Sequence, residues 1–179
     1  MKRKLFDRLS DWKNSLHRKP ILLTGGRGVG KTYLVYDFAK AFYSNIIYLN
    51  FEREPNLLNL FQANSNISLK EILNSKFSIT ETSEPVLLIL DEITDYSDLK
   101  WLSIRINEVK DTYDIIAISS NAVRLQDGPT PETDFLDKDQ FVNFQLFPLD
   151  FEEYLIASSN NWYVDIIKSH YKKNKSIPD

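Results

Sequence analysis

The sequence predicts an α/β fold with a parallel sheet between helices, and two features of the 179-residue chain lead to that prediction. A glycine-rich loop, Gly25–Thr32, lies between an apolar strand pattern and a helical pattern. An unbroken apolar run, Val86–Leu90, is typical of a parallel strand buried on both faces. Each predicted element is taken below in chain order.

Residues 3–16 are expected to form an amphipathic helix that leads into the first strand. Their apolar side chains recur at spacings of three and four, at Leu5, Leu9, Trp12 and Leu16. Trp12 could stack on a nucleotide base, but an aromatic residue in such a pattern belongs more often to the core. We therefore expect Trp12 to be a core residue.

The next segment, Ile21–Leu23, is a short apolar strand followed by the pattern G-x-x-x-x-G-K-T. Glycines let successive backbone N–H groups curl around a polyphosphate, and the following helix N-terminus adds partial positive charge. Lys31 is expected to reach the β and γ phosphates of a nucleotide, and the Thr32 hydroxyl to bind magnesium. The predicted nucleotide-binding residues are Gly25, Gly26, Arg27, Gly28, Val29, Gly30, Lys31, Thr32 and Tyr33.

A helix is predicted over residues 33–42, with one apolar face made of Leu34, Val35, Phe38, Ala41 and Phe42. The β-rich segment 46–51 predicts a second strand. Residues 56–61 are predicted to form a short helix, and Ser68 and Glu71 have the spacing of a capping box that opens another.

Two adjacent carboxylates, Asp91 and Glu92, end the apolar run that begins at Val86. This Walker B pattern would place both at the carboxyl edge of the sheet, where the glycine-rich loop also lies. We expect Asp91 to hold magnesium together with Thr32, and Glu92 to act as the general base toward a water molecule.

After a helix predicted over residues 96–109, the segment 114–118 predicts another buried strand. It ends in three polar residues, Ser119, Ser120 and Asn121. Any of the three could sense the γ phosphate at this exit, or the exit could be an ordinary polar turn.

The polar segment 124–140 is predicted to be a mobile loop, and residues 141–146 a last strand. A proline, Pro148, followed by Asp150 and Glu153, indicates a capped helix start. Residues 162–171 are predicted to form a final helix, with Val164, Ile167 and Tyr171 on one face, before a loop-like tail over 172–179.

The composition, with 42% hydrophobic and 26% charged residues, is that of a globular domain large enough to bury its own core. The chain has no cysteine, which excludes disulfides and thiolate metal sites. Its two histidines, His17 and His170, are too few for a transition-metal site or a His-dependent triad, and both are expected at the surface.

The net charge of −3 gives no general attraction to nucleic acid or to an anionic membrane. Basic residues are concentrated in the first nineteen positions and near the C-terminal end. We interpret these clusters as solvated helix faces, and a contact with nucleic acid stays open as the alternative. No apolar run approaches the ~18 residues of a membrane span, and no signal-type apolar core follows the basic N-terminus. A cytoplasmic protein is therefore expected.

These motifs together resemble the prokaryotic AAA-type ATPases whose nucleotide-binding domain is followed by a domain of unknown function with a restriction-nuclease-like fold. The matching stretches are 25–32, 47–52, 88–93, 116–121 and 147–155. The resemblance implies a P-loop NTPase sheet in the order 5-1-4-3-2, with ATP and Mg²⁺ as ligands. It also implies that residues 1–179 are the ATPase domain alone, with a helical lead-in over 1–19 and a helical extension over 147–179.

The chain departs from the family pattern at several positions. Members usually have Gln at the positions of Gly28 and Thr94, and Gly-Ser in place of Ser119-Ser120. An arginine commonly precedes the Pro148 stretch, but none lies between Asp127 and Phe147. An arginine supplied by another subunit or a protein partner would fill that role.

The sequence thus predicts Mg-dependent ATP binding and hydrolysis. Two alternatives stay open: a nucleotide-regulated binding or oligomerisation switch with little hydrolysis, and a small-molecule kinase. The second would need an arginine-rich lid, and residues 127–140 contain no arginine.

Overall fold

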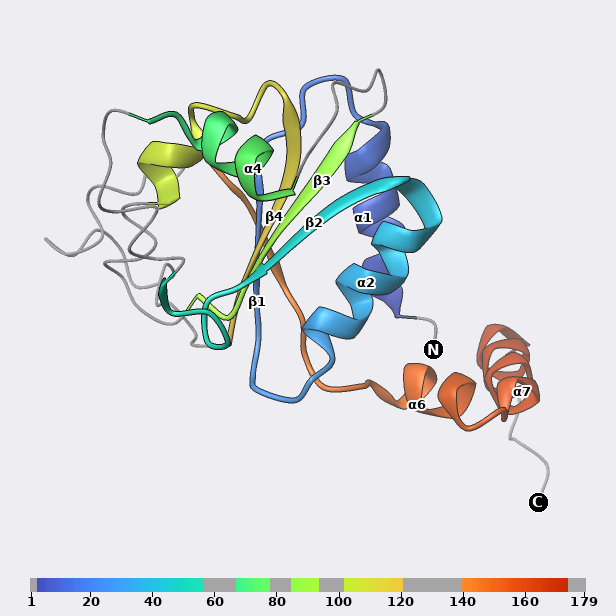
Figure 1. Cartoon of the computed structure of the whole chain (residues 1–179). Helices are drawn as coiled ribbons and strands as arrows, with labels where there is room; N and C mark the ends of the chain where they lie inside the picture. Colours follow the sequence, from blue (N-terminus) through green and yellow to red (C-terminus); the bar gives the residue numbers. More distant parts are fainter. Residues whose placement is uncertain (1–2, 57–66, 78–84, 94–101, 121–139, 174–179) are drawn as a thin grey trace, which may run out of the picture.

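A five-stranded parallel sheet forms the centre of the molecule in the computed structural model, which describes residues 3–56, 67–77, 85–93, 102–120 and 140–173 (Figure 1). The strands are β1 (Ile21–Thr24), β2 (Asn45–Asn50), β3 (Val86–Asp91), β4 (Tyr113–Ser119) and β5 (Val142–Gln145). Their order is β2-β3-β4-β1-β5, and each neighbouring pair is parallel. Read from the other edge, this is the predicted order 5-1-4-3-2.

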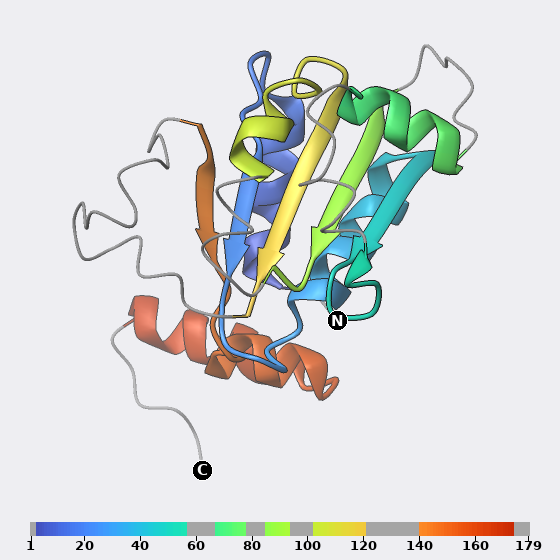
Figure 2. The ribbon, with the colours of Figure 1, turned by 60° about the vertical axis from the view of Figure 1, so that its left-hand side comes forward.

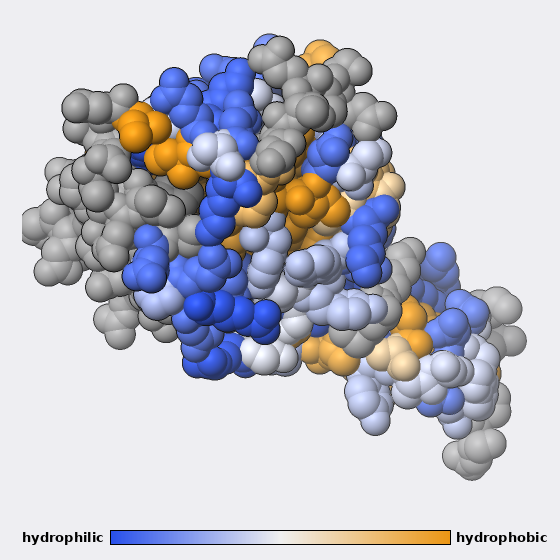
Figure 3. All heavy atoms as spheres, in the orientation of Figure 1, coloured by the Kyte–Doolittle hydropathy of each residue, from blue (hydrophilic) through white to orange (hydrophobic). Residues whose placement is uncertain are grey.

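Helices cover both faces of the sheet (Figures 1 and 2). One face carries α1 (Lys4–Asn14) and α2 (Lys31–Phe42), and the other carries α4 (Leu69–Phe77) and the helical residues 102–106. After β5, the helices α6 (Phe151–Ala157) and α7 (Asn161–Lys173) lie beyond the carboxyl ends of the strands. They form a lobe that stands out from the body of the molecule (Figure 3). Among the described residues, no helix has the length and apolarity needed to cross a membrane.

The central strands β3 and β4 are buried along their whole length, as the unbroken apolar run predicts. Because successive side chains of a strand point to opposite faces, one strand contributes side chains to two hydrophobic cores. Leu87 and Ile89 pack with α1 and α2, whereas Leu88 and Leu90 pack with α4. The two cores hold the strand ends in fixed positions, and those ends carry the site.

Helix α1 buries Leu5, Leu9 and Trp12, as predicted. Trp12 is a core residue: its indole N–H donates to the Lys19 carbonyl at 2.8 Å. The expectation for Leu16 is wrong, because α1 ends at Asn14 and Leu16 is 94% exposed.

The apolar face of α2 differs in part from the prediction. Leu34, Val35 and Phe38 are buried, but Ala41 is exposed and Phe42 is 38% exposed. Ala41 falls at the edge of the stripe that these three residues and the buried Ala39 define, since a helix turns 100° per residue. Phe42 lies at the last turn, where its ring contacts Phe38 but the sheet no longer covers it.

Both predicted capping boxes are present. The Glu71 amide donates to the Ser68 hydroxyl and the Ser68 amide to the Glu71 carboxylate at α4, and Asp150 and Glu153 exchange the same bonds at α6. Lys172 and Lys173 belong to α7 and not to a loop.

Several predicted segments fall on positions that the structure does not describe. They are most of the helix at 56–61, residues 96–101 of the helix at 96–109, the loop at 124–139 and the tail at 174–179.

Candidate functional site

The sheet brings three distant parts of the chain to one edge. The glycine-rich loop follows β1, Asp91 and Glu92 end β3, and Ser119 and Ser120 end β4, which lies between β1 and β3. Parallel strands present all their carboxyl ends at the same edge, so these residues meet although they are far apart in sequence.

The loop after β1 positions Lys31 as the first residue of α2. Its ammonium group donates to the carbonyls of Gly25 and Gly26, both at 2.9 Å. Burial lowers the pKa of Lys31, and the nearby charges of Glu92 and Asp91 partly offset this effect. The N-cap is Gly30 in the left-handed region (φ 96°), which has no side chain to cap the first N–H groups of α2. These groups and Lys31 form a concentrated positive end that suits an anion.

Asp91 is the meeting point of the polar contacts at this edge. Its side chain is 1% exposed, and its Oδ2 accepts from the Thr32 hydroxyl at 3.0 Å and from the Tyr48 hydroxyl at 2.7 Å. Its Oδ1 accepts from the Glu92 amide at 2.9 Å. Donors on α2 and β2 thus hold this carboxylate in one orientation.

Tyr48 is a site residue that the sequence did not reveal. It lies in β2, where it looks like any aromatic strand residue, and only the pairing of β2 with β3 brings its hydroxyl to Asp91. Burial, with the bond to Asp91 adding to it, raises the pKa of Tyr48 to about 12 against a lowering bond from Asn50. The hydroxyl therefore stays a donor at neutral pH.

The Thr32 and Asp91 pair fits magnesium. Mg²⁺ prefers oxygen ligands at about 2.1 Å in octahedral geometry and usually takes few from the protein, the rest coming from water and phosphate. Two oxygens 3.0 Å apart are spaced as neighbouring ligands of such an ion. Within the described ranges there is no group of three or more His, Cys, Asp or Glu side chains that could hold a metal. Thr32 and Asp91 are the residues of this edge that could hold a magnesium ion.

Glu92 has an unusual backbone conformation, with φ at 55° in the left-handed region that non-glycine residues rarely adopt. Directly after it, the Ile93 amide returns to the sheet and donates to the Ile118 carbonyl at 3.0 Å. The left-handed residue therefore stands between the end of β3 and this contact with β4. Such strain, which typically costs about 1–3 kcal/mol, is found mostly at functional positions.

The structure distinguishes the two serines at the end of β4. The Ser120 hydroxyl donates to Glu92 Oε2 at 2.9 Å. Ser119 is fully buried and its hydroxyl donates to the Ile93 carbonyl at 2.7 Å, just after the end of β3. Asn121 lies outside the described residues.

The remaining predicted nucleotide-binding residues, in the loop and the first turn of α2, are mostly exposed. Arg27 is exposed and its guanidinium donates to Glu52 at 3.0 Å. Tyr33 is 51% exposed, Gly26 and Gly28 are exposed, and Val29 is partly buried.

Arg3 is a second residue that sequence reasoning missed. The basic N-terminus was expected to be a solvated helix face, but the Arg3 side chain is only 3% exposed. It donates to the Val29 carbonyl of the loop at 2.9 Å and to the Phe147 carbonyl after β5 at 2.5 Å. The expectation is wrong because the end of β5 and the helix α6 pack against the start of α1. No local sequence pattern indicates this packing.

The histidines match their expectation only in part. His17 is exposed, whereas His170 is partly buried in α7, with its Nδ1 at 2.9 Å from the Ile166 carbonyl. Neither lies in the site.

A family model described as an AAA domain matches residues 17–155. No curated protein matches the chain.

Two solved structures have similar folds. The Aeropyrum pernix ORC1 protein in complex with DNA matches 88% of this chain at 15% identity, with a TM-score of 0.48. The C. elegans PCH-2 structure matches 91% at 19% identity, with a TM-score of 0.47. The chain spans 47% and 44%, respectively, of the length of these two proteins.

Proposed function

This chain belongs to the AAA domain family, and we propose that it binds ATP together with magnesium and hydrolyses the γ phosphate. The observation that carries the proposal is the meeting of Lys31, Thr32, Asp91 and Glu92 at one edge of the sheet, with Thr32 hydrogen-bonded to Asp91. A cation, a metal-binding oxygen pair and a carboxylate base are the three groups that phosphoryl transfer to water requires.

Binding begins with the loop. Backbone N–H groups of residues 25–32 face the phosphates, and Lys31 exchanges its bonds to the Gly25 and Gly26 carbonyls for bonds to phosphate oxygens. Because burial lowers the pKa of Lys31, a phosphate anion also supplies the negative charge that stabilises its ammonium form.

Thr32 and Asp91 would hold the metal. Magnesium, when bound, neutralises charge that develops on the β and γ phosphates during transfer. Tyr48 keeps the Asp91 carboxylate turned toward Thr32.

Glu92 accepts a proton from the attacking water, and Ser120 orients its carboxylate. Of the two serines at the end of β4, we therefore assign the sensing role to Ser120. Ser119 has a structural role, since it is buried and bonded to the Ile93 carbonyl.

The nucleotide-regulated switch remains the second candidate function. The observation that favours it is the connection of the phosphate loop, through Arg3, to the lobe formed by α6 and α7. An arginine from a neighbouring copy or a protein partner would raise hydrolysis by roughly 10³-fold or more. Hydrolysis by an isolated chain is then slow.

Two variants test the proposal. Lys31→Ala should abolish ATP binding, because the loop loses its buried cation. Glu92→Gln should keep binding and lower turnover by about 10²–10⁴-fold, because Gln cannot accept the proton. Equilibrium titration with labelled ATP and phosphate release measure the two effects. Unchanged turnover in Glu92→Gln contradicts the role of Glu92.

A concentration series distinguishes the two functions. Turnover per chain should rise with protein concentration if a second copy completes the site, and should be measured with and without DNA. Tight ATP binding with no turnover at any concentration favours the switch.

A further inference from the structure

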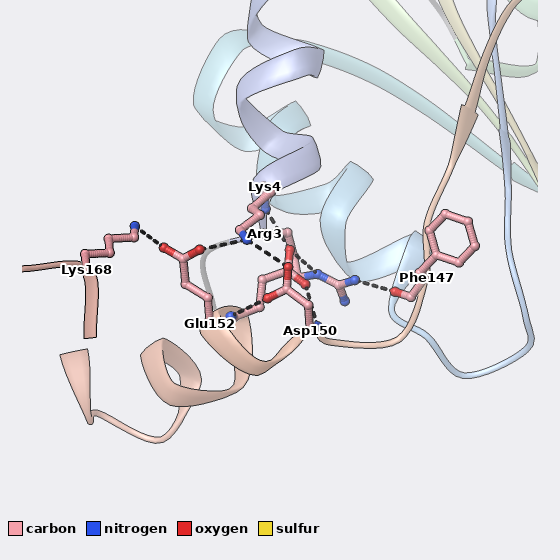
Figure 4. Close-up of polar contacts among 7 residues, drawn as sticks. Arg3, Lys4, Phe147, Asp150, Glu152 and Lys168 are labelled. Carbon is pink, nitrogen blue, oxygen red and sulfur yellow. Dashed lines mark hydrogen bonds and ion pairs between the residues drawn. The ribbon is translucent and has the colours of Figure 1, made fainter. Parts of the chain in front are cut away.

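Arg3 connects three segments that are distant in sequence. Its Nη1 bonds to the Val29 carbonyl in the phosphate loop, and its Nη2 bonds to the Phe147 carbonyl between β5 and α6. Its Nε lies 3.2 Å from a carboxylate oxygen of Glu153 in the first turn of α6. Figure 4 shows the guanidinium between α1, the loop and the start of α6.

The bond to Val29 fixes the orientation of one peptide group in the loop. The described chain has no cis peptide, so the Val29 carbonyl and the Gly30 N–H point in opposite directions. Since Arg3 holds the carbonyl on its own side, the Gly30 N–H points away from Arg3. Gly30 is the N-cap of α2, at the position where loop N–H groups would face a phosphate.

Glu153 holds Arg3 in place and also belongs to α6. Its carboxylate accepts from the Lys4 amide at 2.8 Å and forms the capping box with Asp150. Both ionic side chains are almost completely buried, at 3% exposure for Arg3 and 8% for Glu153. A buried pair of this kind tolerates little displacement, because each charge depends on the other.

We propose that Arg3 is a positioning residue that sets the Val29–Gly30 peptide for phosphate binding and couples that peptide to the seating of α6. This rests on the proposed function, because the phosphate is that of the bound nucleotide. Binding that fixes the loop also fixes Arg3 and through it the start of α6. By linkage, the seating of α6 changes nucleotide affinity by the same factor.

Arg3→Lys tests the proposal. A lysine keeps the charge but cannot reach Val29, Phe147 and Glu153 together, because its donors radiate from one atom. We expect about a tenfold loss of affinity for ATP with magnesium, from the lost charge-assisted bond to Val29. Hydrogen exchange of wild type should slow over residues 147–157 when ATP binds, and this ATP-dependent protection should disappear in Arg3→Lys. A purely structural role would lower thermal stability without changing that response.

Lys4 provides the matched control. Lys4 lies in α1, and its ammonium pairs with Asp150 and Glu152 at the start of α6, at 2.8 and 2.7 Å. Like Arg3 it joins α1 to α6, but the described loop residues make no bond to it. Its pair with Asp150 is solvent-exposed, so it contributes little to the seating of α6, and Lys4→Gln should leave ATP affinity and loop exchange unchanged. Glu153→Gln, which has no contact with the loop, should weaken ATP binding in the same direction as Arg3→Lys.

The same exchange experiment without nucleotide separates the two proposals. Failure of the proposed function appears as a wild-type chain that does not bind ATP. The coupling still predicts that Arg3→Lys speeds exchange both in residues 26–31 and in 147–157. Exchange that rises in only one of these segments, or equal effects of Arg3→Lys and Lys4→Gln on the loop, overturns the inference.

Discussion

At the scale of single residues, the site depends on how Asp91 is oriented. A buried carboxylate needs donors, and Asp91 has one from α2, one from β2 and one from its own neighbour, Glu92. The bond from the Tyr48 hydroxyl is the shortest of the three. Tyr48 itself lies outside both the glycine-rich loop and the end of β3. In the proposed mechanism, Tyr48 therefore acts on Asp91, the proposed metal ligand, and not on the nucleotide.

Removing the Tyr48 hydroxyl should weaken magnesium binding. In Tyr48→Phe, Asp91 loses an orienting bond, and such losses typically reduce metal affinity by about 10-fold or more. We expect the magnesium concentration for half-maximal ATP binding to rise by that factor. ATP titrations over a magnesium series measure it.

Tyr36 is the control for this substitution, because its ring packs against Tyr48 with centroids 5.3 Å apart. Tyr36→Phe removes a hydroxyl from the same aromatic pair and should leave the magnesium dependence unchanged. An equal shift in both variants would assign the effect to packing.

At the scale of elements, the turn from β1 into the loop packs directly against the end of β5. The Leu146 amide donates to the Thr24 carbonyl at 2.8 Å, and a Cβ added at Gly25 would lie 2.3 Å from the Leu146 carbonyl oxygen. The backbone of the two strand ends thus leaves no room for a side chain at Gly25. The neighbouring Gly26 differs, since a Cβ there would meet Val29 at an ordinary 3.5 Å.

This difference makes Gly25→Ala and Gly26→Ala a matched pair. Gly25→Ala should lower the free energy of unfolding by at least ~2 kcal/mol, because backbone must move to admit the methyl group. It should also abolish ATP binding, since the loop shifts away from α2.

Gly26→Ala should retain the fold and most of the ATP affinity. Chemical denaturation and ATP titration of both variants measure the contrast. Similar stability in the two variants would show that the β1 and β5 ends can separate without cost.

At the scale of the whole molecule, α1 is fastened at both ends by buried ionic contacts. At the N-terminal end of α1, Arg3 contacts the phosphate loop. In the last turn of α1, Lys13 bonds to Asp114 at 2.9 Å. Asp114 also accepts from Arg18 at 2.7 Å and from the Tyr43 hydroxyl at 2.8 Å. Lys13 belongs to α1 and Tyr43 ends α2. Because Asp114 lies at the start of β4, this cluster joins α1 and α2 to the end of the sheet opposite the site.

The Asp114 cluster predicts acid sensitivity. Burial alone would raise the pKa of Asp114, but the bonds from Arg18, Lys13 and Tyr43 outweigh it and hold the pKa below its ordinary value of 3.8. A lowered folded-state pKa gives stability that is present above 3.8 and is lost as the pH falls through the folded value. Asp114→Asn should therefore cost about 2–3 kcal/mol at pH 7 and flatten the loss of stability below pH 4.

Asp111 is the control, because it is exposed and only three residues away. Asp111→Asn should leave both the stability at pH 7 and its acid dependence nearly unchanged. Urea unfolding from pH 7 to pH 3 compares the variants. A pH dependence of Asp114→Asn that equals that of wild type would contradict the stabilising role of its charge.

Local chemistry explains how much of this molecule was predictable. The loop, the buried run before Asp91 and both capping boxes depend on neighbours within a few residues, so the sequence predicted the elements that contain them. The end of α1 before Leu16 and the exposure of Ala41 depend on where packing stops, and those two expectations were wrong.

The sequence by itself therefore determined the α/β class, the strand patterns and the glycine-rich loop, because each is encoded in the spacing of nearby residues. Only the tertiary structure brought Tyr48 to Asp91, distinguished Ser120 from Ser119 and buried Arg3 between the loop and α6. The Arg3–Glu153 contact joins residues that are 150 positions apart in the sequence. These tertiary contacts follow from the pairing of β2 with β3 and from the closure of α6 over α1, which no local pattern of residues specifies.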